Sequence, residues 1–365
     1  MEINSLYIHI PFCQHLCGYC DFTKMFYLRP YVSKYIKEVV KQINNLENKK
    51  FNTIYIGGGT PSSLSPSLLE LLLSSLSKHK HRNTEFTIEV NPETMSQKKL
   101  MLMKKYGINR VSIGVQTFND ELLKIINRFH NKRQVVYWIN KFNSYGINNI
   151  NIDVLYGLPN QTLDIFKKDI DIATSLNVTH ISSYSLTVSK GTAFFKNGIK
   201  EVSDEESRMY YDTLYKELKK KKFNRYEVSN FAKDKKYSKH NLNYWNANEY
   251  IGIGLGAHGY ENGVRYQNTS NIKEYLKGNY YISKETLSQI EQIEEFVMLN
   301  LRKEAGINKN EFKKRFKEDI HEVFTTSIIE NINNNLLKET KTHIKTSYQG
   351  MLLLDSVLLK MFLEL

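Results

Sequence analysis

Residues 13–20 have the sequence CQHLCGYC and hold the only three cysteines of the chain. A Cys-x3-Cys-x2-Cys spacing points three sulfurs at one centre, whereas a lone buried cysteine usually packs as a small apolar residue. The apolar run at 6–10 predicts a strand, which Pro11 ends. The cysteines are therefore expected on a loop that directly follows a strand.

Three thiolates at this spacing suit few kinds of site. A structural zinc site needs four protein ligands, so His9 or His15 would have to complete it. A disulfide would use two cysteines and leave one over. A cubane iron–sulfur cluster usually takes four thiolates, and three would leave one iron open to a small molecule. We favour the cluster and keep zinc as an alternative.

The composition indicates a large globular protein of a reducing compartment. The chain has 365 residues, 41% of them hydrophobic, enough to bury the core of one large barrel or two domains. Three cysteines fit reducing conditions. The start of the chain lacks the regions of a signal peptide, and no apolar run approaches the about 20 residues of a membrane span. We expect a cytoplasmic protein.

The formal net charge is +13. A basic chain of this kind is typical of partners such as nucleic acid or an anionic membrane surface. The lysines are spread in small groups beside predicted helices and loops, however, and no nucleic-acid motif accompanies them. We therefore expect solvated lysines and no nucleic-acid partner, while a contact with anionic lipid remains compatible with the charge.

Strand and helix patterns alternate about six times over the first 225 residues. After the first strand, further strands are predicted at 51–56, 85–90, 110–115, 149–155 and 180–187, each followed by a helical pattern. Strands separated by helices favour a parallel sheet with crossover helices. A partial TIM-like (β/α)6 barrel is favoured over an open sheet, because candidate site residues lie where the strands end.

The chain divides into three parts. Residues 1–225 form the predicted α/β barrel. Residues 226–285 are rich in Asn, Gly, Tyr and His with little helical periodicity, and we expect an extension packed on the barrel. Residues 286–365 are again helical and predict a small, mainly helical C-terminal domain of winged-helix-like type, with a short hairpin at 344–354.

Polar residues follow the predicted strands. A glycine run, 57–59, precedes Thr60 and lets the backbone approach a ligand closely, although a tight turn alone would also explain it. Glu89, Gln116 and Asp153 end three successive strands, whose carboxyl ends converge on one mouth of a barrel. Arg128 follows the fourth strand and can pair with a carboxylate. We expect these groups to face the cysteine loop.

The motifs at 7–22 and 57–61 resemble the radical S-adenosylmethionine (SAM) superfamily. Within it, the chain is similar to the oxygen-independent coproporphyrinogen III oxidase family. The similarity continues through 88–92, 112–116, 153–159 and 240–245, and so covers nearly the whole chain.

This resemblance implies a set of cofactor-binding residues. Cys13, Cys17 and Cys20 would ligate three irons of a [4Fe-4S] cluster, and the fourth iron would bind the amino and carboxylate groups of SAM. The resemblance assigns no catalytic side chain. The residues implied to contact SAM are Tyr7, Tyr19, Gly58, Gly59, Thr60, Glu89, Gln116, Arg128 and Asp153.

Two departures separate the branches of the family. The decarboxylating oxidase is expected to have the pattern Cys-x3-Cys-x2-Cys-x-Cys, preceded by a long segment. In this chain Phe22 stands in place of the last cysteine, and twelve residues precede Cys13. Both fit the haem chaperone branch. We expect a protein that binds haem and delivers it to an acceptor haem protein, with a membrane-bound acceptor and a homodimer both compatible. The alternatives are the oxidase itself and a zinc-stabilised binding protein.

Residues 240–245, HNLNYW, resemble the haem-binding motif of that branch. The imidazole of His240 can ligate haem iron, and Tyr244 and Trp245 offer flat apolar faces to a macrocycle. On spacing alone, His240 is better explained as a solvated loop histidine, and it is the resemblance that favours haem binding.

Residues 254–259, GLGAHG, match the dinucleotide pattern G-x-G-x-x-G. A dinucleotide fold needs a helix to start there. Residues 261–263 predict a turn instead. We therefore expect these glycines to let the backbone approach SAM or the haem edge, with Ala257 and His258 near the adenosyl end.

Overall fold

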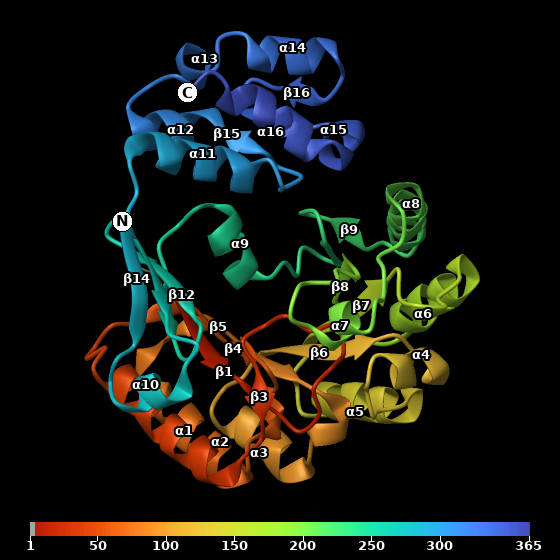
Figure 1. Cartoon of the computed structure of the whole chain (residues 1–365), viewed down its shortest axis with the longest axis vertical. Coiled ribbons are helices and arrows are strands. Elements are labelled where there is room, and N and C mark those ends of the chain that lie inside the picture. The colour runs from red at the N-terminus through yellow and green to blue at the C-terminus, as the bar shows by residue number, and fades with distance from the viewer. Residues whose placement is uncertain (1–3) are drawn as a thin grey trace.

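The computed structural model describes residues 4–365. Its centre is a nine-stranded sheet in the order β11-β1-β4-β5-β6-β7-β8-β10-β9 (Figure 1). All pairs from β11 to β8 are parallel, and β10 and β9 are antiparallel. The strands are β1 (Ser5–Ile10), β4 (Phe51–Gly58), β5 (Lys80–Val90), β6 (Arg110–Gln116), β7 (Asn149–Tyr156), β8 (His180–Ser185), β9 (Asn224–Arg225), β10 (Asn230–Ala232) and β11 (Ile251–Ile253).

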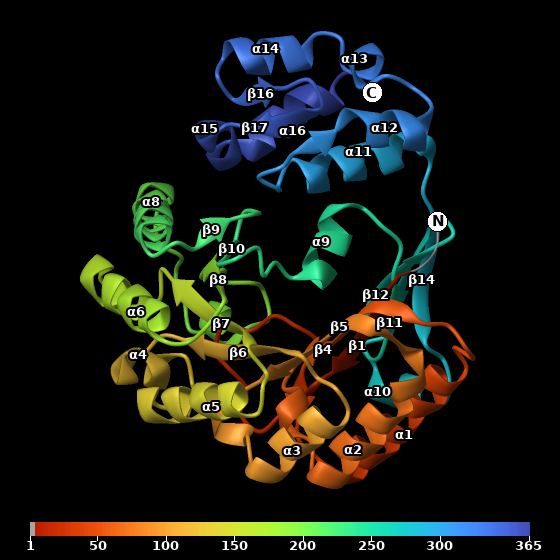
Figure 2. The same ribbon diagram turned by 180° about the vertical axis from the view of Figure 1, so that it is seen from behind.

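Helices follow the parallel strands and form an outer layer, which Figures 1 and 2 show from opposite sides. They are α1 (Arg29–Asn44), α2 (Pro66–Ser75), α3 (Gln97–Lys105), α4 (Asp120–Ile125), α5 (Lys132–Ser144), α6 (Leu163–Ser175), α7 (Ala193–Lys196) and α8 (Asp204–Lys220). Polar caps begin several of them: Asn131 and Gln134 form a capping box on α5, as Ser203 and Glu206 do on α8. The predicted partial (β/α)6 barrel is confirmed.

The sheet has an apolar outer face and a polar inner face. Leu6, Ile8 and Ile10 of β1 are fully buried in the same core as Val32 and Ile36 of α1. Because side chains alternate along a strand, Tyr7 and His9 point the other way. This alternation leaves polar side chains for the barrel interior.

The extension after residue 225 completes the sheet at both edges, through β9 and β10 on one side and β11 on the other. It also contains helices α9 (Lys239–Trp245) and α10 (Ile272–Leu276), which are too short to show helical periodicity in the sequence. A small antiparallel sheet joins β12 (His258–Glu261), β13 (Val264–Asn268) and β14 (Tyr281–Thr286). The boundaries at 225 and 285 stay predictions.

The C-terminal domain combines helices with the three-stranded sheet β15-β17-β16, as winged-helix-like domains do. The elements are α11 (Gln289–Asn300), β15 (Ile307–Asn308), α12 (Lys309–Phe316), α13 (Ile320–Val323), α14 (Ser327–Asn333), β16 (Leu337–Glu339), β17 (His343–Thr346), α15 (Tyr348–Leu352) and α16 (Leu354–Phe362). The β16–β17 hairpin begins before the predicted stretch 344–354 and overlaps it only up to residue 346, and most of the remainder is α15. No helix within residues 4–365 is both long and apolar enough to span a bilayer.

Candidate cofactor site at the barrel mouth

A cavity of about 430 Å³ opens inside the barrel. It runs from the cysteine loop down the inner faces of β4 to β8. The expected site residues that line it are Cys13, Cys17, Tyr19, Cys20, Gly58, Gly59, Thr60, Glu89, Gln116, Arg128 and Asp153. The structure thus brings together most of the residues implied for the cluster and SAM.

Short strands β2 (Phe12–Cys13) and β3 (Met25–Phe26) pair at the ends of the cysteine loop. Gly59 presses against this loop, because a Cβ there would lie 2.9 Å from Cys13 Sγ. Thr60 Oγ1 donates to the same sulfur at 3.4 Å. Gly59 therefore allows a close approach to the protein's own chain at Pro11 and Cys13, and the expected approach to a ligand stays a prediction.

Cys13, Cys17 and Cys20 line one cavity, and three thiolates are the donors that a cluster takes when each bonds its own iron. No three His, Cys, Asp or Glu side chains of residues 4–365 are grouped to hold a single metal ion. Burial raises the pKa of the Cys13 thiol to about 11 and also raises the pKa of Cys20. Iron must therefore displace protons from these thiols when it binds.

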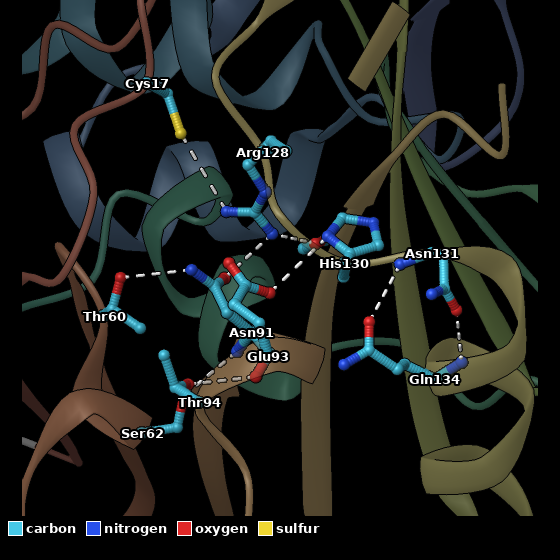
Figure 3. A network of polar contacts seen from close by, with 11 residues as sticks. Cys17, Thr60, Ser62, Asn91, Glu93, Thr94, Arg128, His130, Asn131 and Gln134 are labelled. Carbon is cyan, nitrogen blue, oxygen red and sulfur yellow. Dashed lines mark hydrogen bonds and ion pairs between the residues drawn. The ribbon is translucent and has the colours of Figure 1, made fainter. Parts of the chain in front are cut away.

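Arg128 connects the cysteine loop to the strand ends (Figure 3). Its Nη1 lies 4.0 Å from Cys17 Sγ, and its Nη2 donates to Asn91 Oδ1 at 3.1 Å and to the Gly114 carbonyl. Asn91 in turn donates to Thr60 Oγ1 at 3.2 Å. A guanidinium held beside the sulfurs suits a negatively charged cluster or the carboxylate of SAM.

Sequence reasoning missed Asn91, which accepts a hydrogen bond from Arg128, and the nearby pair Glu93 and His130. Asn91 follows Glu89 closely, so its place after the strand was a signal that could have found it. His130 is buried and its Nδ1 lies 3.5 Å from Glu93 Oε2 (Figure 3). Nothing in the local sequence links Glu93 to His130, because the two meet only in the fold.

Two acids face the cavity with their oxygens already hydrogen-bonded. Glu89 accepts from Tyr55 Oη at 2.8 Å and from the Gly58 N–H at 3.0 Å. Asp153 accepts from Asn151 Nδ2 at 2.7 Å and from Ser112 Oγ at 3.2 Å, and it lies inside β7 and not at its end. Burial raises the pKa of Glu89 to about 7 and also raises the pKa of Asp153.

Gln116 ends β6 in the left-handed region, with φ 69°. A residue with a side chain pays for this conformation in strain, and such strain is common at ligand sites. The register between β6 and β7 shifts between Gly114 and Gln116. The irregularity fits a role in turning Gln116 into the cavity.

Three residues expected to contact SAM lie outside the cavity lining. Tyr7 is half-buried, with its hydroxyl 3.0 Å from His9 Nδ1. Ala257 and His258 lie at the start of the β12–β13 sheet. The glycines before them approach the protein's own chain, since a Cβ on Gly256 would lie 2.2 Å from Thr23 Oγ1. No helix begins there, as predicted, and the SAM contact of these residues stays a prediction.

His240 lies in α9 and is 1% exposed. Its Nδ1 is 2.8 Å from Thr53 Oγ1 and its Nε2 is 2.8 Å from Tyr244 Oη, so both ring nitrogens have partners. The ring stacks on Tyr55 with centroids 5.1 Å apart. Burial lowers the pKa of His240 to about 3. A solvated loop histidine, the alternative considered for this position, is contradicted.

Comparisons with known proteins cover the whole chain. The family model "Radical SAM superfamily" matches residues 7–173, and "HemN C-terminal domain" matches 287–353. "Heme chaperone HemW" of Lactococcus lactis is 38% identical (99% of this chain, 98% of the relative), and that of Bacillus subtilis is 36% identical (97% and 98%). The structure of coproporphyrinogen III oxidase (HemN) from Escherichia coli superposes with TM-score 0.87 at 21% identity (100% and 91%), which shows the fold.

The radical SAM superfamily implies a [4Fe-4S] cluster and SAM, and the cavity offers donors suited to both. With identities of this size over nearly its entire length, the chain belongs to the HemW family of haem chaperones within the radical SAM superfamily.

Proposed function

We propose that this protein is a cytoplasmic haem chaperone that binds haem and passes it to an acceptor haem protein. The observation that carries the proposal is the similarity over nearly the full length to relatives named as haem chaperones. The HNLNYW motif at 240–245 supports it, because imidazole and aromatic faces suit a haem. A membrane-bound acceptor and a homodimer are both compatible with this proposal.

At the cavity mouth, Cys13, Cys17 and Cys20 would hold the cluster, and Arg128 would balance its negative charge. The amide of Gly58 and the side chains of Glu89 and Gln116 would orient SAM. Bound there, the cluster and SAM supply one-electron reductive chemistry. The protein's part is to position the two groups and keep water out.

At α9, His240 would be an iron ligand and Tyr244 and Trp245 would contact the macrocycle. In the conformation described, Thr53 and Tyr244 occupy both imidazole nitrogens. A ligand bond to iron therefore requires that one of these hydrogen bonds break. Haem binding is expected to shift α9 away from β4.

The alternative, oxidative decarboxylation of coproporphyrinogen III, is supported by the fold alone. Phe22 stands at the position where the oxidase pattern has its fourth cysteine. The Phe22 side chain is 65% exposed and lines the cavity. A phenylalanine cannot ligate iron. We expect no coproporphyrinogen dehydrogenase activity.

The test uses anaerobically purified protein with a reconstituted cluster. One sample receives coproporphyrinogen III, SAM and a reductant, and a parallel sample receives haem. We expect a stoichiometric Soret shift with haem and no vinyl porphyrin, and His240→Ala should weaken haem binding. Accumulation of decarboxylated product together with methionine would instead establish the oxidase.

A further inference from the structure

Arg110 is a buried cation at the floor of the cavity. It is the first residue of β6, and its side chain shares the inner face of the strand with Ser112, Gly114 and Gln116. All four line the cavity, and Arg110 lies at the strand end away from Gln116. Arg110 is only 2% exposed.

This guanidinium makes no hydrogen bond or ion pair with any residue of the described chain. Its Nε is buried without a hydrogen-bond partner, and no carboxylate of residues 4–365 lies within ion-pair distance of it. An arginine stays charged at all physiological pH values. Burying a charge without a partner is strongly unfavourable, so a site of this kind is incomplete until an anion fills it.

The nearby acids do not complete it. Glu89 is bound by Tyr55 and Gly58, and Asp153 by Asn151 and Ser112. Burial raises the pKa of Glu89 to about 7, so this carboxyl carries only part of a negative charge at neutral pH. Burial also raises the pKa of Asp153, although the charge of Arg110 acts in the opposite direction on both carboxyls. The guanidinium therefore faces the cavity with its donors unused.

The surroundings indicate what the anion belongs to. The forked donors of arginine match a carboxylate. Burial lowers the pKa of His240 most, and the positive charge of Arg110 lowers it further. The two side chains therefore lie close enough in the barrel interior to interact. Asn241, the neighbour of His240 in α9, lines the same cavity. A carboxylate at Arg110 and an iron at His240 would thus suit a single ligand.

We propose that Arg110 binds a carboxylate at the cavity floor and that, resting on the proposed function, this carboxylate is a propionate of haem. The other source of a carboxylate is SAM itself. Its carboxylate is expected at the open iron beside the cysteines, at the opposite end of the cavity. The experiment separates the two.

The test compares haem with haem dimethyl ester, in which both propionates are neutral. Wild type should bind haem at least about tenfold more tightly than the ester, the range of a charge-assisted hydrogen bond. Arg110→Gln should lose that preference while its affinity for the ester is unchanged, and Arg110→Lys should keep part of it. Arg82→Gln, an exposed arginine at the start of β5, is the matched control and should behave as wild type.

Each other outcome overturns the proposal in a distinguishable way. Equal affinity of wild type for haem and the ester refutes the propionate contact while leaving the chaperone function intact, and it needs no variant. Weaker SAM binding in Arg110→Gln with unchanged haem binding assigns the site to SAM. Failure of wild type to bind haem at all refutes the proposed function and the propionate contact together.

Discussion

The two ends of the barrel interior differ in how their recognisable residues are engaged. At the mouth, the three cysteines and Gln116 face an open cavity. At the floor, His240 is packed between Tyr55, Thr53 and Tyr244, and α9 lies between the barrel strands and the C-terminal domain (Figure 1). Sequence motifs mark both ends, but His240 must break a hydrogen bond before it can bind a ligand, whereas the cysteines and Gln116 already face the cavity.

The difference separates a preformed site from one that must open. A ligand at the mouth meets side chains already held in place by Arg128, Asn91 and Gly59. A ligand that binds His240 must first break one of the two hydrogen bonds of the imidazole. A hydrogen bond between neutral partners contributes about 1 kcal/mol. The apparent affinity for haem is therefore expected to equal the intrinsic affinity multiplied by the fraction of molecules in which α9 is open.

The largest expected effect is at the mouth. Cys17→Ala should abolish the cluster, because two thiolates cannot hold it, and iron content together with visible absorbance measures the loss. The comparison predicts that haem titration of this variant is unchanged. His15→Ala is the control, since a zinc site completed by that imidazole would lose its metal while a cluster would not. Retained iron in Cys17→Ala would contradict the assignment of the mouth.

The barrel and the mouth could be predicted because their signals are local. Glycines at 57–59, acids after strands and cysteines on a loop all lie where chain direction alone brings strand ends together. The partners of His240 could not be predicted. Thr53 is distant in sequence and looks like any β-strand threonine, so the contact depends on how α9 docks. The unpaired Arg110 was missed for the same reason, because only the fold shows that no acid reaches it.

The second effect is a pH dependence with opposite sign at the two ends. The pKa of Glu89 is raised from 4.5 to about 7, so the native state holds a proton that the unfolded state has lost, and stability falls as pH rises through this window. The pKa of His240 is lowered from 6.5 to about 3, so between these pH values the unfolded state holds a proton that the native state lacks. The contribution of His240 to the free energy of unfolding therefore rises as pH rises through this window. Each pKa unit corresponds to about 1.4 kcal/mol at most.

Urea unfolding of the cluster-free protein at pH 5 and pH 8 measures this difference. The free energy of unfolding of Glu89→Gln, relative to that of wild type, should be higher at pH 8 than at pH 5 by up to about 3 kcal/mol. Glu121→Gln on the exposed surface of α4 should follow wild type throughout. A gain for Glu89→Gln that is the same at both pH values would show that Glu89 is ionised in the native state.

The smallest effect tests the closed floor directly. Thr53→Val removes the partner of His240 Nδ1, and Tyr244→Phe removes the partner of Nε2 while keeping the aromatic face. Whichever nitrogen ligates iron, the variant that frees it should bind haem about fivefold more tightly, the equivalent of one neutral hydrogen bond. Thr87→Val is the matched control, a buried strand threonine whose hydroxyl has no partner. If neither Thr53→Val nor Tyr244→Phe changes the affinity for haem, the hydrogen bonds of His240 do not restrain haem binding. The two ends of the barrel would then differ only in how exposed their ligand-binding side chains are.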